Sequence, residues 1–115
     1  MEPVFIKGSR IPALVSIFFK VAAITIGPWV FCRDTSPSTA LMNHESIHVK
    51  QWVELGFVLF PVLYLMAWLF GLVVHRSPVL AYLAIPFERE AREFEGEPHK
   101  RRAFGWRKYD LMELP

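Results

Sequence analysis

The sequence predicts a single α+β domain in which a short β-hairpin packs against several helices. The chain has 115 residues, the length of one typical domain, so we treat residues 1–115 as a single domain. Two segments rich in β-branched and aromatic residues flank Gly27-Pro28, and this arrangement is typical of a hairpin. Most of the remaining chain carries apolar helical patterns that are separated by proline and glycine.

The composition excludes several classes of protein. Hydrophobic residues make up 53% of the chain and charged residues 21%, so the chain is too apolar for intrinsic disorder. The formal net charge is only +2, which argues against a nucleic-acid partner. The single cysteine, Cys32, excludes both an internal disulfide and a metal site built from several cysteines.

The first third of the chain contains the predicted strands. Residues Ala13–Lys20 form a short helix or strand, and Val21–Ile26 and Trp29–Cys32 form the two arms of the hairpin. The polar stretch at residues 33–39 is then a loop.

A long helix is expected from about Thr39 to Phe60. Ser36, Ser38 or Thr39 can cap its first turn. Proline lacks the backbone N–H that a helix interior needs, so we expect Pro61 to kink or end this helix. A second apolar helix then covers Val62–Val74.

The last third begins with the short apolar segment Val79–Ile85. A helix then starts at Pro86, which suits the first helical position, and it stops before Gly96. The tail from His99 to Pro115 is basic and aromatic, and we expect a surface on which neighbouring glutamates neutralise the basic residues.

Residues 55–74 contain no aspartate, glutamate, lysine, arginine or histidine. At about 1.5 Å per residue, this run is long enough to cross the ~30 Å hydrocarbon layer of a membrane. The alternative is a buried pair of shorter helices that is broken at Pro61. Gly56, Pro61 and Gly71 favour the broken helix, although membrane helices also tolerate glycine and proline.

The residues His44-Glu45-Ser46-Ile47-His48 match the pattern HExxH inside the long helix. Side chains at positions i and i+4 of a helix lie one above the other, so His44 and His48 can reach the same ion. Imidazole nitrogens suit Zn²⁺, which needs three protein ligands and a water in a catalytic site. Glu45 then lies beside the open position and can accept the proton of that water.

A third ligand must come from elsewhere in the chain. The continuation HxxGxxH is excluded, because Gln51 and Glu54 occupy the positions of its glycine and third histidine. The acidic helix that starts at Pro86 can supply a carboxylate instead. At about 100° per residue, Glu88 and Glu95 flank one edge of its apolar face and Glu90 the other, and this periodicity does not choose between Glu88 and Glu90.

The segment HESIHVKQW, followed later by AYLAIPFEREA, resembles small zincin-like proteins of the gluzincin type from phages and bacteria. The upstream segments GSRIPALVS and AAITIGPWVF are also similar to such proteins, so the resemblance covers about residues 8–109. It implies that Glu88 is the metal ligand and that Ala91 is a packing position. Larger relatives often have aspartate where this chain has Arg92, so support for a metal-bound histidine falls to Glu90 or Gln51.

The expected function is that of a zinc-dependent metallopeptidase acting on a peptide or protein substrate. His44, His48 and Glu88 bind Zn²⁺, and Glu45 acts as general base. The resemblance also implies an intracellular setting. The alternative is a non-catalytic zinc-binding structural or interaction module, and either protein can associate with a membrane through residues 55–74. Tyr64 and Tyr82 serve as packing residues or as hydrogen-bond donors in the site.

Overall fold

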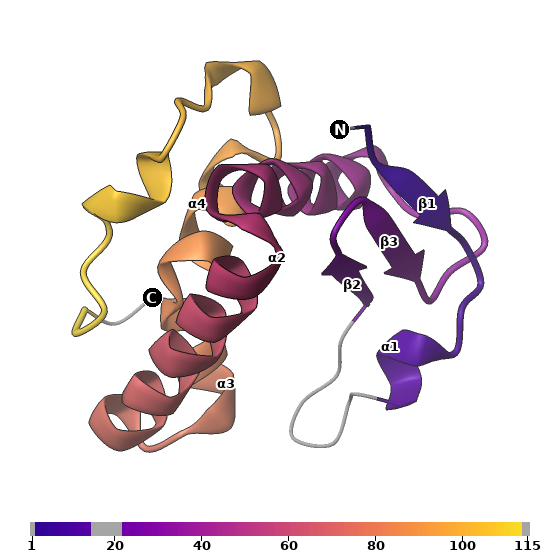
Figure 1. Cartoon of the computed structure of the whole chain (residues 1–115). Helices are drawn as coiled ribbons and strands as arrows, with labels where there is room; N and C mark the ends of the chain where they lie inside the picture. Colours follow the sequence, from indigo (N-terminus) through magenta and orange to yellow (C-terminus); the bar gives the residue numbers. More distant parts are fainter. Residues whose placement is uncertain (1, 15–21, 114–115) are drawn as a thin grey trace.

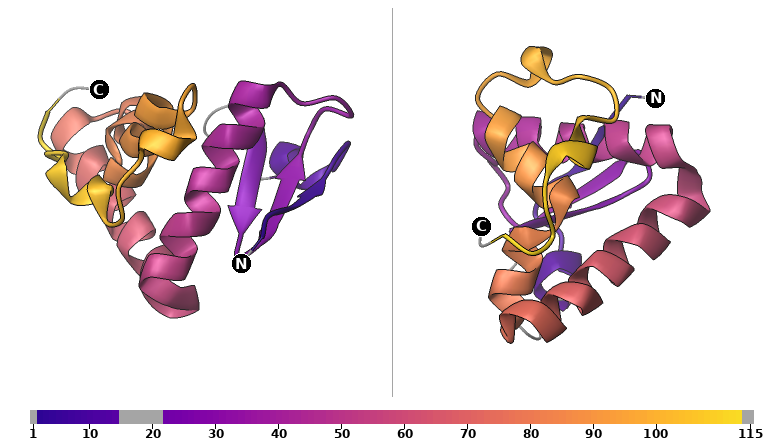
Figure 2. Two further views of the ribbon diagram at one scale, coloured as in Figure 1. Left: turned by 90° about the horizontal axis from the view of Figure 1, so that it is seen from above. Right: turned by 90° about the vertical axis from the view of Figure 1, so that its left-hand side faces the viewer.

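The computed structural model describes residues 2–14 and 22–113, and it confirms the predicted α+β class (Figure 1). A small sheet lies on one side of the molecule and most of the helices on the other, as the left view in Figure 2 also shows. The strands are β1 (Val4–Ile6), β2 (Ala23–Ile26) and β3 (Trp29–Cys32), and the helices are α1 (Ile11–Leu14), α2 (Thr39–His75), α3 (Pro78–Ala84) and α4 (Pro86–Phe94). Two 3₁₀ turns, η1 (Pro98–Lys100) and η2 (Gly105–Lys108), follow in the tail.

The sheet has the strand order β1-β3-β2. Strands β2 and β3 form the predicted antiparallel hairpin around Gly27-Pro28, with Ile26 opposite Trp29. Strand β1 pairs with β3 in parallel and was not expected from the sequence. Of the element predicted at Ala13–Lys20, the structure describes only the end of helix α1, and residues 15–21 lie outside the described part of the chain.

Helix α2 covers both predicted helices, Thr39–Phe60 and Val62–Val74, and its bend lies at Gly56 instead of Pro61. The prediction that Pro61 kinks or ends the helix was wrong, because the helix continues through this residue to His75. Gly56 has φ 87° and ψ 174°, a conformation that is essentially restricted to glycine, and it turns the chain sharply between two helical halves. Pro61 removes only one helical hydrogen bond, to the carbonyl of Phe57 directly after the bend.

Helix α2 contributes to two separate hydrophobic clusters. It contacts strand β2 on one side and helices α3 and α4 on another. The buried residues of the sheet cluster are Ala23, Val30, Cys32 and Val49. Those of the helical cluster are Trp52, Phe60, Ala67, Ile85 and Phe87. Along α2 the change from one cluster to the other lies between Val49 and Trp52, about one turn before the bend at Gly56.

Helices α2 and α3 form a tight hairpin. Arg76 ends α2 in a left-handed conformation, and the Ser77 hydroxyl caps the first turn of α3. A side chain at Gly71 would lie only 2.9 Å from Cα of Ala81, so the hairpin requires glycine at this position. The segment Val79–Ile85, which the sequence analysis described only as short and apolar, is largely helical.

One described helix, Thr39–His75, is long and apolar enough to cross a membrane. Its most apolar 18-residue window has a mean hydropathy of 2.4, yet only 17% of that window is buried inside the molecule. A helix of this composition normally lies within a protein core or a membrane. The outer side of α2 is therefore unusual for a surface helix.

Candidate metal centre

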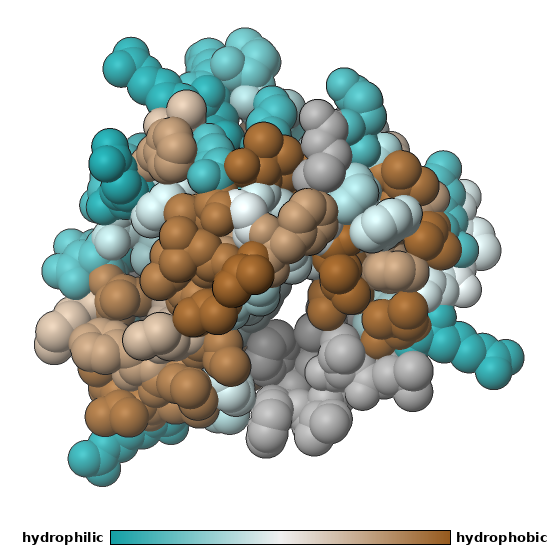
Figure 3. All heavy atoms as spheres, viewed as in Figure 1, coloured by the Kyte–Doolittle hydropathy of each residue, from teal (hydrophilic) through white to brown (hydrophobic). Residues whose placement is uncertain are grey.

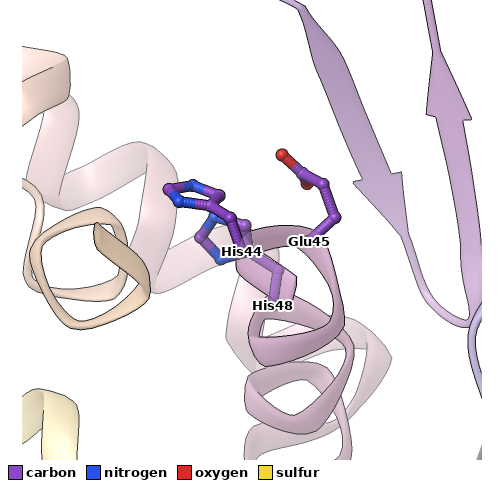
Figure 4. A group of neighbouring side chains, drawn as sticks. All are labelled: His44, Glu45 and His48. Carbon is purple, nitrogen blue, oxygen red and sulfur yellow. The ribbon is translucent and has the colours of Figure 1, made fainter. Parts of the chain in front are cut away.

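Two histidines occupy adjacent turns of the first half of α2. Ser38 caps this helix, and its hydroxyl oxygen accepts a hydrogen bond from the N–H of Leu41 at 3.1 Å. His48 lies four positions after His44, so their side chains project from the same side of the helix (Figure 4), with ring centroids 5.0 Å apart. Both residues are buried.

Helix α4 brings a carboxylate to both imidazoles. The Oε1 atom of Glu88 lies 3.0 Å from Nε2 of His44, and its Oε2 atom lies 3.1 Å from Nε2 of His48. Glu88 is 4% exposed. Two phenols also contact it: the hydroxyl of Tyr64 donates to Oε2 at 2.7 Å, and that of Tyr82 donates to Oε1 at 3.2 Å.

The outer nitrogens of the two rings contact further acceptors. His44 Nδ1 lies 2.9 Å from a carboxylate oxygen of Glu95, and His48 Nδ1 lies 2.7 Å from Oε1 of Gln51. The Gln51 amide nitrogen donates to the carbonyl of Phe87 and to Glu90, so its oxygen must face His48. These contacts favour a proton on each Nδ1 and leave the Nε2 lone pairs directed at Glu88.

A buried chain of polar contacts extends from Gln51 to the tail. Glu90 is fully buried, and it accepts hydrogen bonds from Gln51 at 2.8 Å and from Nε of Arg101 at 2.8 Å. The guanidinium of Arg101 also makes two hydrogen bonds, at 3.0 and 2.6 Å, to the carboxylate of Glu54. Arg101 therefore fastens the tail to both helices of the site.

The arrangement around Glu88 suits a cation. Each Nε2 lies opposite a carboxylate oxygen, so a positive charge between them is favourable, and either a proton on the imidazole or a bound cation can supply it. His48 Nε2 is buried and has no hydrogen-bond partner among the described residues, although it lies within 3.1 Å of Glu88. Ligand atoms about 2.0–2.1 Å from a tetrahedral Zn²⁺ lie about 3.3 Å from one another, close to the separations seen here. The residues thus fit a zinc ion held by two histidines and a glutamate.

The pKa values show how strongly this pocket favours positive charge. Burial lowers the pKa of His48, but the neighbouring Glu88 carboxylate outweighs burial and raises it to about 9. Burial raises the pKa of Glu88, yet the two histidines hold it well below its usual range. Burial, followed by the charge of Glu88, raises the pKa of Tyr82, so this phenol stays protonated and continues to donate to Glu88.

Glu45 lies next to the histidines but has a different environment. A nitrogen of each imidazole and an oxygen of Glu45 all lie within 4.8 Å of one another, and the Glu45 side chain turns toward the strands (Figure 4). The hydroxyl of Thr25, on strand β2, donates to Oε2 of Glu45 at 2.7 Å.

Glu45, His48 and Glu88 line a cavity of about 620 Å³ between strand β2 and the second half of α2. Apart from Thr25, the other residues that line this cavity are apolar or aromatic: Ala23, Ile24, Ile26, Trp52, Phe60, Pro61, Tyr64, Leu65, Trp68 and Tyr82. Glu45, His48 and Glu88 therefore face a space of the size that small-molecule ligands occupy.

The structure brings together all four residues that the sequence singled out, His44, Glu45, His48 and Glu88. Glu90 contacts Gln51 and Arg101, and this chain of contacts supports His48.

Sequence reasoning missed Glu95, Thr25 and Arg101. A signal existed for Glu95, which lies seven residues after Glu88 on the same helix edge. Arg101 was expected in a neutralised surface, whereas its side chain is only 4% exposed. No local sequence pattern predicts the roles of Thr25 and Arg101, because each donates a hydrogen bond to a carboxylate that is distant in the sequence.

Comparison of the chain with models of protein families, with curated proteins and with solved structures finds no match.

Proposed function

We propose that this protein is a zinc-dependent hydrolase that cleaves peptide bonds. The observation that carries the proposal is the contact of one buried carboxylate, Glu88, with the Nε2 atoms of both His44 and His48. Two imidazoles and one carboxylate are a ligand set used by catalytic zinc sites, which keep a fourth position open. The cavity beside these residues supplies room for a substrate.

Each residue has a role in this proposal. His44, His48 and Glu88 hold the ion, and Tyr64 and Tyr82 keep Glu88 oriented through their hydroxyl groups. A bound zinc ion polarises the substrate carbonyl and makes a water molecule easier to deprotonate. Glu45 accepts the proton of the attacking water and later delivers it to the leaving amine. Thr25 holds one oxygen of Glu45, which fixes the carboxylate at the edge of the cavity.

The test has two parts, metal content and hydrolysis. Purified protein that has been freed of loosely bound metal should retain one zinc ion per chain by mass spectrometry. Hydrolysis is followed with a library of fluorogenic peptides. Glu45→Gln should keep the zinc and lose hydrolysis, and His44→Ala should lose both. Glu97→Gln, a surface carboxylate that pairs with Lys100, is the control and should change neither.

The outcomes separate the proposal from its alternative. Protein without zinc would refute the metal centre itself. Zinc at full occupancy together with no hydrolysis of any peptide would favour a non-catalytic zinc-binding module, and a hydrolysis rate unchanged in Glu45→Gln would remove Glu45 from the chemistry.

A further inference from the structure

The second half of α2 and the adjoining part of α3 expose a continuous set of apolar side chains, which we call the apolar outer face. Those on α2 are between 42% and 78% exposed. The residues of the face are Val58, Leu59, Val62, Leu65, Met66, Leu69, Phe70 and Val73 on α2, and Val79 and Leu80 on α3. Figure 3 shows hydrophobic side chains gathered over this part of the molecule, whereas the top of the molecule in the same view is hydrophilic.

The face is broad. At about 100° per residue, its eight α2 residues cover an arc of roughly 140° on one side of the helix. The residues on the opposite side, Phe60, Ala67 and Gly71, are buried against the rest of the protein. The helix is therefore apolar all round, although the protein covers only one side of it.

Charge is confined to the ends of this hairpin. Between Glu54 and Glu88, the only residues that can carry charge at neutral pH are His75 and the exposed Arg76 at the hairpin tip. The helix from Phe57 to His75 extends about 28 Å at 1.5 Å per residue. An uncharged face of this length with a basic residue at its edge is complementary to acyl chains that are bordered by lipid phosphates.

We propose that the apolar outer face docks on a lipid bilayer. A second copy of the chain fits less well, because a helix-to-helix contact covers a narrow seam and would leave the flanks of this arc in water. The bilayer covers the whole arc. The domain rests on the membrane without crossing it, since α3 has only seven residues, about 10 Å, and the inner side of α2 packs on α3 and α4.

This docking places the cavity next to the lipid. Leu65 belongs to the apolar outer face and also lines the cavity, and the exposed Ile26 lines it from the side of the sheet. Figure 3 shows a hollow between the hydrophobic groups over α2 and those over the sheet. Resting on the proposed hydrolase function, we assign the substrate class as an apolar polypeptide segment held at a membrane surface.

Flotation of the full chain with vesicles tests the docking. Vesicles of phosphatidylcholine, and of phosphatidylcholine mixed with anionic phosphatidylglycerol, are centrifuged through a density gradient with the protein. The wild type should rise with both. The variant Val58→Gln/Met66→Gln/Val73→Gln removes three well-exposed groups of the face and should partition into vesicles roughly 100-fold less. The control Val4→Gln/Met112→Gln changes apolar residues that are 49% and 62% exposed elsewhere, and it should float like the wild type.

Three results would overturn the docking proposal. The wild type could stay in solution with both kinds of vesicle, or the triple variant could float as well as the wild type. Light scattering could also show that the wild type is a stable dimer and the triple variant a monomer, which would mean that a second copy covers the face.

Zinc content and peptide cleavage are measured on the same samples to separate the two proposals. The wild type should cleave an apolar peptide faster when an acyl anchor holds it in vesicles, and the triple variant should lose this advantage but keep its rate on the free peptide. Equal rates of the wild type on anchored and free peptide would refute the assigned substrate class. Failure of the hydrolase proposal would instead appear as absent zinc or absent cleavage in samples that still float.

Discussion

The buried guanidinium of Arg101 offers a sharp test of how the tail is held on the site. Its side chain is 4% exposed, and its partners Glu90 and Glu54 have side chains that are 0% and 11% exposed. Arg101→Met keeps most of the side-chain volume but removes the charge and three hydrogen bonds. Two buried carboxylates then lose their cation.

The expected loss of stability follows from the hydrogen bonds that each carboxylate keeps in the variant. Glu54 retains hydrogen bonds from the N–H of Phe104 and the indole of Trp106, whereas among the described residues Glu90 retains only the Gln51 amide. Removing one partner of a buried ion pair typically costs about 3–5 kcal/mol, because an uncompensated charge stays inside. We expect the free energy of unfolding to fall by about 3–5 kcal/mol and the melting temperature by about 10–20 °C.

Urea unfolding followed by circular dichroism measures the effect, and the chain supplies a matched control. Lys100 is the neighbouring residue and pairs with Glu97, but their side chains are 64% and 55% exposed. Lys100→Met should therefore cost less than about 1 kcal/mol. Adding Glu90→Gln to Arg101→Met should recover part of the lost stability, since a neutral amide is easier to bury. Equal losses in the Lys100 and Arg101 variants would refute the buried contact.

Three further predictions concern the site and the helices around it. Gln51→Leu removes the acceptor that orients His48, and it should weaken zinc binding about 10–100-fold in a competition titration with a chelator, whereas Glu97→Gln should leave the affinity unchanged. Gly56→Ala should destabilise the protein by about 1–3 kcal/mol, because open space surrounds the position and only the backbone strain of φ 87° opposes the new methyl group. Gly71→Ala should cost about 1–3 kcal/mol by forcing α2 away from Ala81. Gly96→Ala, at an open position without positive φ, is the control for both glycines in thermal unfolding, and a loss there as large as at Gly56 or Gly71 would contradict the reasoning.

Local signals in the sequence predicted much of the fold. The hairpin followed from the turn dipeptide Gly27-Pro28, and α4 followed from Pro86 at its start and Gly96 after its end. Both features depend on residues that are close together in the chain. Helical spacing placed His44 and His48 on one side of α2 for the same reason.

The features that local patterns missed depend on distant contacts. Strand β1 has only three residues and exists because it pairs with β3, more than twenty residues later. The bend of α2 was assigned to proline, the stronger local breaker, but the structure has it at Gly56, whose positive φ of 87° is a conformation that glycine adopts readily. Glu88 and Glu90 lie on different edges of the same short helix, and only the position of α4 against α2 distinguishes their surroundings.

The bend in α2 at Gly56 also affects when the metal ligands come together during folding. The two histidines precede the bend, on the part of α2 that contacts the sheet. Glu88 comes later in the chain, on α4, and it can contact the histidines only after α2 and α3 have folded against each other. An ion bound by these side chains would link the first part of α2 to α4, which also meet there through hydrogen bonds such as the one from the Gln51 amide to the Phe87 carbonyl. Its binding energy would add directly to the stability of the folded protein, so a chelator should weaken the contact between α2 and α4 before the rest of the protein unfolds.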